Sequence, residues 1–312
     1  MYKIKINISL PANYIYHMLS VSKVGYDNSY GEKYLSLHNE DDLMIIKNHE
    51  IDLTVSGGEH CGKLYGLLVA KPASLDDMFS LEQYFKSIID LFSNNDPKNT
   101  AEKYQDLNNN LLDFGAKSFQ ELFEILYKAF KDSSDTVTQI CSVYLSNIDL
   151  YVNHIWKNEQ LILNNYKKLL MSELNSKQSL VLDWEYQLGE KLNIDEFEIV
   201  LVNSIEDGAQ GIDISSTKDV FNINENVKSL IGFISHEIGI YIMFQTIPVS
   251  IKQNIQKYWL CIESLATYHN QKVLYEDENL FAKDNIYFKK FDEIYSVDKY
   301  QNFLEIIEQA VS

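Results

Sequence analysis

Residues 235–243, SHEIGIYIM, place a histidine beside a glutamate in a segment that is otherwise mostly apolar. A catalytic zinc site needs three protein ligands, an open position for water and a nearby carboxylate that accepts the proton of that water. The HExxH pattern supplies two histidine ligands one helical turn apart, and its glutamate is the base. His236 and Glu237 match the first half of this pattern, so hydrolysis assisted by zinc is the chemistry to consider.

The second histidine of the pattern is missing. Ile240 stands at its ordinary position and Tyr241 follows. An alkyl side chain donates nothing to a metal, and a phenol is a poor zinc ligand at neutral pH because its pKa is about 10. A third ligand is often a glutamate on the next helix, which is where Glu263 lies. The sequence therefore predicts metal ligands at His236 and Glu263 in a set that is one ligand short, so that zinc binding would be weak or absent.

The elements that must position these residues follow from periodicity and from turn-forming residues. Alternation over residues 2–10 predicts an opening strand, residues 63–71 a second strand, and apolar residues at helical spacing a helix over 81–92. Residues 93–100, SNNDPKNT, are rich in turn formers and mark a boundary. We therefore expect an N-terminal α+β domain over residues 1–95.

The remainder, residues 101–312, is predicted to form a mainly helical domain with a short mixed sheet. Residues 101–192 have a helical pattern throughout. Three short strands are expected next, at residues 197–202, 211–216 and 220–224. Asn224 or Asn226 can then cap a helix over about 225–244 that carries the SHEIG segment, with Ser235 on its surface. A second helix over about 250–274 carries Glu263. The overall class is α+β.

Composition limits the partners and the compartment. The chain of 312 residues has 45 acidic and 27 basic side chains and a net charge of −18, which argues against a nucleic-acid partner. Every basic residue is lysine, so the chain lacks the planar fork of arginine that binds carboxylates and phosphates through two hydrogen bonds. We expect no signal peptide and no membrane partner, because no segment has about 18 uninterrupted apolar residues. Three cysteines far apart in the sequence fit the reducing cytoplasm.

The region from about residue 180 to 270 resembles the zincin family of flavohaemoglobin-expression-modulating QEGLA-motif proteins, which includes tyrosine carboxypeptidases acting on tubulin tails. That family carries HEIGTH and, further along, QEGLA, whose glutamate completes the metal site. This chain has HEIGIY and IESLA. The resemblance implies a gluzincin-like arrangement of the C-terminal domain, with residues 211–216 as the edge strand before the motif helix.

Position by position, the resemblance assigns His236 as first metal ligand, Glu237 as general base and Glu263 as third ligand. Gly239 matches the glycine of the family motif. Tyr241 stands where the second histidine of the family lies, and this departure breaks the metal site.

Three functional hypotheses follow. The first is a pseudopeptidase that binds a peptide or protein chain along the edge strand by strand addition. The second is an active, carboxypeptidase-like zinc peptidase whose missing ligand comes from Tyr241, His269 or the N-terminal domain. In that case Glu237 would activate the water, and Tyr241 or another donor would stabilise the oxyanion. His269 is the weaker candidate, because it is expected about 240° around the helix from Glu263 and either exposed or capping. The third hypothesis is coincidence, with His236 a core histidine.

Overall fold

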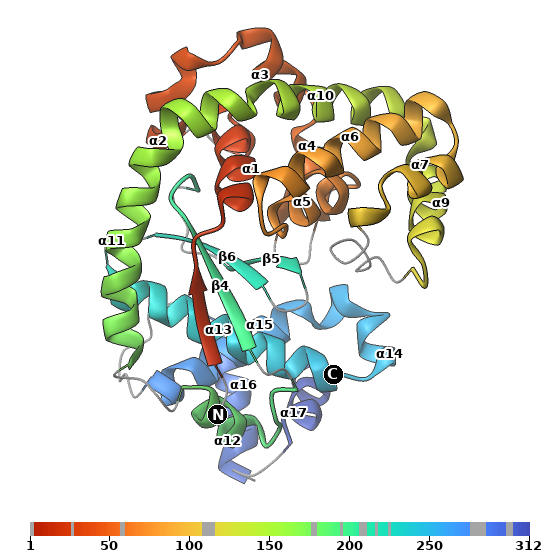
Figure 1. The fold of residues 1–312 in the computed structure, drawn as a ribbon. Helices are drawn as coiled ribbons and strands as arrows, with labels where there is room; N and C mark the ends of the chain where they lie inside the picture. The colour runs from red at the N-terminus through yellow and green to blue at the C-terminus, as the bar shows by residue number, and fades with distance from the viewer. Residues whose placement is uncertain are drawn as a thin grey trace.

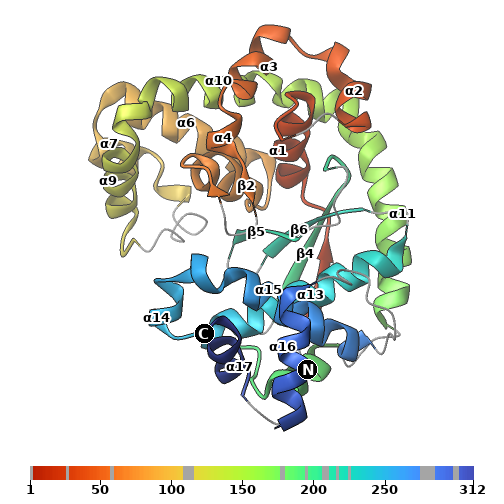
Figure 2. The ribbon, with the colours of Figure 1, turned by 180° about the vertical axis from the view of Figure 1, so that it is seen from behind.

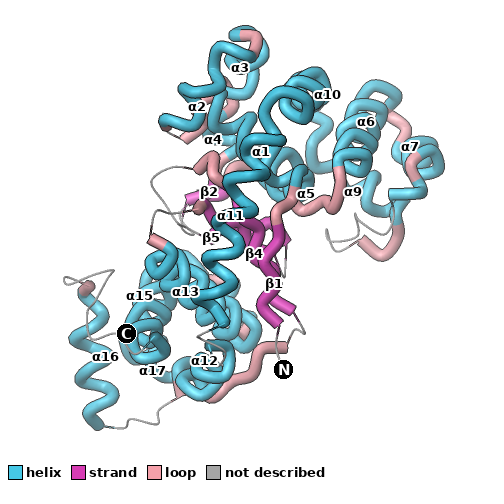
Figure 3. The backbone as a smooth tube through the Cα atoms, turned by 60° about the vertical axis from the view of Figure 1, so that its left-hand side comes forward, coloured by secondary structure: helices cyan, strands magenta, loops and turns pink. Residues whose placement is uncertain are grey.

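The computed structural model of the chain describes most of its residues (Figures 1 and 2). The described segments are residues 3–25, 28–56, 60–107, 116–175, 180–193, 196–205, 211–215, 218–223, 226–274, 285–297 and 302–312. Helices lie on both sides of one small mixed sheet (Figure 3). The mainly helical α+β class predicted from the sequence is confirmed.

The sheet has four strands in the order β1-β4-β6-β5. Its strands are β1 (Lys3–Asn7), β4 (Glu196–Val202), β5 (Gly211–Ser215) and β6 (Lys218–Asn222). The first three strands in the spatial order are parallel, and β5 runs antiparallel to β6 at the edge. In register, Ile6 pairs with Ile199, so the opening strand of the chain completes a sheet whose other strands come from its second half.

The sheet separates two hydrophobic cores because successive side chains of a strand point to opposite faces. On β4, Val200 and Val202 belong to an N-terminal core, together with Ile214 of β5, Val220 of β6 and residues between Ala12 and Ile155. Ile199 and Leu201 belong to a C-terminal core, together with Ile6 and residues between Leu163 and Ala310. Burial on both faces explains why β4 is an almost continuous apolar run.

The helices of the N-terminal core cover one face of the sheet (Figure 1). They are α1 (Leu10–Val21), α2 (Ser29–Tyr34), α3 (Glu40–Lys47), α4 (Glu50–Leu53), α5 (Lys71–Ala73), α6 (Met78–Asn94), α7 (Pro97–Lys103), α9 (Phe119–Phe130) and α10 (Ser134–Leu150), beside a small hairpin of β2 (Val55–Ser56) and β3 (His60–Cys61). Through a π-helical turn, Tyr151–Ile155, α10 continues into α11 (Trp156–Asn175), which contacts β4 and leads to the opposite face. The long helical run predicted for this stretch is confirmed.

The helices of the C-terminal core are α12 (Leu180–Leu188), α13 (Val227–Thr246), α14 (Val249–Lys252), α15 (Ile255–Leu274), α16 (Ile286–Val297) and α17 (Phe303–Val311). Asn226 caps α13, because its side chain accepts a hydrogen bond of 3.0 Å from the amide of Lys228. Among the described helices, α13 alone is long and apolar enough to cross a membrane. Of the apolar 18-residue stretch in this helix, 56% is buried inside the fold. Its neighbours α11, α12 and α15 account for that apolar surface.

One predicted strand is wrong. Residues 63–71 were expected to be extended, but Gly66–Ala70 form a π-helical turn that leads into α5. A short apolar run fits a buried helix as well as a buried strand, and periodicity alone cannot separate the two. Here the carbonyl of Leu67 accepts a hydrogen bond from the Tyr84 hydroxyl of α6, at 2.7 Å, inside the N-terminal core.

The boundary predicted at residues 93–100 spans the end of α6 and the beginning of α7. Both helices contribute residues to the N-terminal core, and the Tyr104 hydroxyl after α7 donates to Asp90 of α6 at 2.7 Å. The predicted strands at 197–202, 211–216 and 220–224 correspond to β4, β5 and β6, although residues 216, 217 and 224 lie outside the described residues.

Helix α12 lies closely against α13 through a single indole. The Trp184 side chain is fully buried, and its Nε1–H donates to Ser235 Oγ at 2.9 Å. A Cβ atom on Gly239, one turn further along α13, would lie 2.3 Å from the nearest indole carbon. Gly239 is therefore needed for this close approach. Ser235, expected on the helix surface, is fully buried instead, because it faces α12.

We predict that Gly239→Ala lowers the free energy of unfolding by about 1 to 3 kcal/mol, because the added methyl group overpacks a filled core. Chemical denaturation followed by circular dichroism measures the change. Gly66→Ala is the matched control, since a Cβ there meets nothing within 4 Å. It should be neutral or slightly stabilising. Equal losses in the two variants would contradict the role given to the Trp184 contact.

Candidate functional site

The structure brings together the histidine and the glutamate that the sequence predicts as metal ligands. Helices α13 and α15 pack against each other, and His236 Nε2 lies 2.9 Å from Glu263 Oε2. The side chains are 12% and 32% exposed respectively, so solvent reaches the pair. Nearby, the Asn270 side-chain amide of α15 donates to the carbonyl of Gly232 at 2.8 Å, a buried bond that fixes the two helices in register.

The second position of the HExxH pattern is occupied by a core side chain. Ile240 lies four residues after His236, which is about 40° further around a regular helix and on the same side. It is 8% exposed and belongs to the C-terminal core. At this position the helix contributes hydrophobic contact and no electron-pair donor.

Tyr241 points elsewhere. On a regular helix it lies about 140° from His236. Its ring packs edge-on against Phe197 of β4, with ring centroids 6.0 Å apart, so it faces the sheet. Glu237, the predicted general base, is half-buried on α13, about 100° around the helix from His236.

His269 is not part of this pair. It is 2% exposed, and its Nε2 lies 2.7 Å from the hydroxyl of Tyr295 on α16. The expectation that His269 is exposed or capping is wrong, because α16 packs against α15 and places Tyr295 on the His269 ring. Burial, and then the nearby charge of Lys272, lower the pKa of His269 to about 3. A neutral histidine held by a tyrosine inside the core has a structural role.

The donor set does not fit a zinc ion. Zinc in proteins takes at least three protein ligands, from Cys, His, Asp or Glu. Among the residues that the structure describes, no group of three or more such side chains is placed to hold a metal. His236 and Glu263 supply two donors, and the third place on that side of α13 is taken by Ile240.

Sequence reasoning missed the residue that orients the site. Trp184 sits in a helix with no motif of its own, far from the SHEIG segment in the sequence. The paired small residues Ser235 and Gly239, one turn apart, are the signal that a bulky side chain packs there. That signal does not say which side chain it is.

Comparison of the chain with models of known protein families, with curated proteins and with solved structures finds no match. The resemblance to the QEGLA-motif zincins therefore rests on the short motifs and the placement of their residues.

The burial of His269 predicts how the free energy of unfolding depends on pH. In the unfolded chain His269 has an ordinary pKa of about 6.5, whereas in the folded protein the pKa is about 3. Between these values the unfolded state binds more protons, so the free energy of unfolding falls as pH is lowered below about 6.5, by about 1.4 kcal/mol per pH unit for this residue.

Urea titrations at pH 6.5 and 4.5 measure this loss. In His269→Gln, which keeps a partner for Tyr295, the loss should be smaller by about 2 to 3 kcal/mol, since other groups titrate equally in both proteins. The same loss in the two proteins would show that His269 takes up its proton without unfolding.

The second prediction concerns the missing ligand. Ile240→His should create a three-ligand set with His236 and Glu263, because position 240 lies one turn after His236 on the same side of α13. Tyr241→His is the matched control, because position 241 faces β4. Isothermal titration with zinc should show binding at least about 100-fold tighter for Ile240→His than for Tyr241→His. Tighter binding by Tyr241→His would mean that the helix uses the longer register of the family motif.

Proposed function

We propose that this protein is a pseudopeptidase: a zincin-like chain that holds a peptide or protein segment without cleaving it. The observation that carries the proposal is the pairing of His236 with Glu263 at 2.9 Å, beside a buried Ile240 where the second ligand would stand. The packing of α13 against α15, with His236 facing Glu263, supports a zincin-like arrangement of the two helices. The zinc chemistry lacks one donor.

The edge strand β5 supplies the means of holding a peptide. It is the last strand in the sheet order and pairs on one side only, with β6, within the described part of the chain. An edge strand presents unpaired backbone N–H and C=O groups that an extended segment can pair with. Because β5 also contacts α13, a segment added there would lie beside the motif helix.

Charge limits which segment would bind. With a net charge of −18, the protein attracts neutral or basic segments more than acidic ones. Without arginine, it also lacks the usual clamp for a terminal carboxylate. Both features favour an internal stretch of a partner chain over an acidic C-terminal tail.

We predict that peptides selected from a random phage-displayed library bind equally well with and without EDTA and remain intact. Fluorescence anisotropy measures the binding, and mass spectrometry after prolonged incubation detects any cleavage. Cleavage that EDTA abolishes would favour the active-peptidase hypothesis instead.

Hydrogen–deuterium exchange tests the place of binding. The amides of residues 211–215 should exchange more slowly in the complex, because strand addition pairs them. The hairpin of β2 and β3 is an internal control that should not change. Protection of the hairpin with none at β5 would contradict binding along the edge strand.

A further inference from the structure

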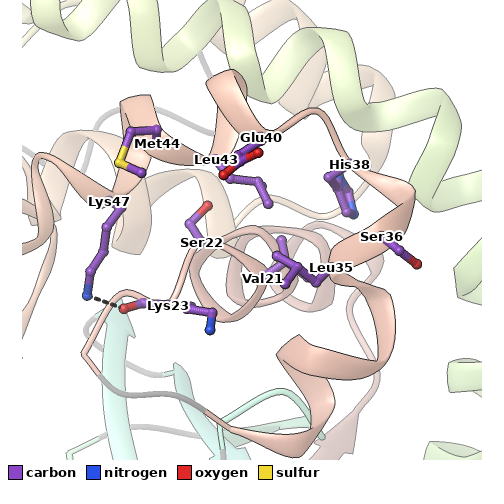
Figure 4. A pocket seen from close by; sticks show the side chains of 10 residues that line it. All are labelled: Val21, Ser22, Lys23, Leu35, Ser36, His38, Glu40, Leu43, Met44 and Lys47. Carbon is purple, nitrogen blue, oxygen red and sulfur yellow. Dashed lines mark hydrogen bonds between the residues drawn. The ribbon is translucent and has the colours of Figure 1, made fainter.

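A second candidate site lies away from the motif helices, within the N-terminal group of helices. An open cavity of about 490 Å³ is lined by the C-terminal end of α1, the turn at residues 35–37 and α3 (Figure 4). This volume is in the range of small-molecule sites. Part of its wall is apolar and is formed by Val21, Leu35, Leu43 and Met44.

Ser22 gives the cavity an unsatisfied hydrogen-bonding group. Its side chain is 3% exposed, and its Oγ has no hydrogen-bond partner. In Figure 4 the hydroxyl points into the space below Leu43 and Glu40. Leaving a buried hydroxyl unpaired is unfavourable, and a ligand that bonds to it would remove that cost.

The lysines of the cavity wall are already neutralised. Lys23 Nζ lies 2.7 Å from Glu32 Oε1, and Lys47 Nζ lies 2.7 Å from Glu50 Oε2. The ammonium of Lys47 also donates to the carbonyl of Lys23. Neither lysine is therefore a free anion receptor.

Glu40 is the lining charge that remains. It is exposed, and no ion pair joins it to a basic side chain among the described residues. In Figure 4 its carboxylate lies above the hydroxyl of Ser22. The wall near Ser22 therefore offers a negative charge and a hydrogen-bond acceptor to the same space.

His38 forms a fixed part of the wall. Its Nδ1 lies 2.9 Å from Asn147 Oδ1, and its Nε2 lies 2.9 Å from the Nε2 of the fully buried His17. Asn147 donates through Nδ2 to Asp42, at 3.1 Å, so its Oδ1 must accept and His38 Nδ1 carries the proton. Both nitrogens of His38 are engaged, which leaves Glu40 and Ser22 to recognise a ligand.

We propose that this cavity binds a small organic amine with an apolar body. The ammonium group would pair with the Glu40 carboxylate and donate a hydrogen bond to Ser22 Oγ. The apolar body would contact Val21, Leu43 and Met44, whose polarisable thioether adapts to such groups. The site does not depend on the proposed peptide-binding function, since none of its residues belongs to α13, α15 or the sheet.

Three probes that share a phenylethyl body and differ in their polar group separate the effect of charge from that of apolar contact. They are 2-phenylethylamine, 2-phenylethanol and 3-phenylpropionate. Each is titrated at pH 7 into the full chain labelled with ¹⁵N, and changes in the NMR chemical shifts of the backbone amides of α1 and α3 measure binding. The amine should bind at least tenfold more tightly than either of the others. No binding of the amine, or equal or tighter binding of the carboxylate, would overturn the proposal.

Matched variants test the two recognition groups. Glu40→Gln and Ser22→Ala should each weaken binding of 2-phenylethylamine at least fivefold, and Glu40→Gln should remove the preference for the amine over the alcohol. Asp41→Asn is the control, because Asp41 is an exposed neighbour that does not line the cavity. It should leave the affinity unchanged. Equal affinities in all four proteins would place the amine elsewhere and refute the assignment.

Discussion

The indole of Trp184, packed against Gly239 and hydrogen-bonded to Ser235, fixes how helix α13 is turned about its axis. With that face held against α12, His236 faces Glu263 on α15, and Tyr241 faces β4. The positions that the zinc motif uses are therefore set by a packing contact on another side of the helix. A glycine at this place is explained by that contact, without reference to a metal.

The same orientation makes the loss of the second ligand compatible with a stable fold. Burial of an isoleucine contributes about 1.5 to 3 kcal/mol, and Ile240 is buried. A histidine at that position would carry polar nitrogens into an apolar environment, and a metal would be needed to satisfy them. The chain has hydrophobic packing where a peptidase has a metal ligand.

Much of the local structure and one long-range contact could be predicted from the sequence. Apolar spacing and Asn226 defined the motif helix, and the positions of His236 and Glu263 on successive helices predicted that they would meet. The strand predicted over residues 63–71 was wrong because a short apolar run has no distinctive period. The pairing of β1 with β4 could not be predicted, since alternation predicts a strand but not its partner. The packing of Trp184 and the unsatisfied hydroxyl of Ser22 depend on tertiary contacts, which no local pattern encodes.

We propose that the paired motif helices hold no catalytic metal. The most direct test is the zinc content of the native protein, purified without chelator or metal-affinity resin and measured by plasma mass spectrometry beside His236→Ala. If they hold none, both proteins should contain the same trace of zinc, far below one ion per chain. Zinc near one ion per chain in the native protein, lost in His236→Ala, would contradict this proposal and would mean that another side chain completes the site.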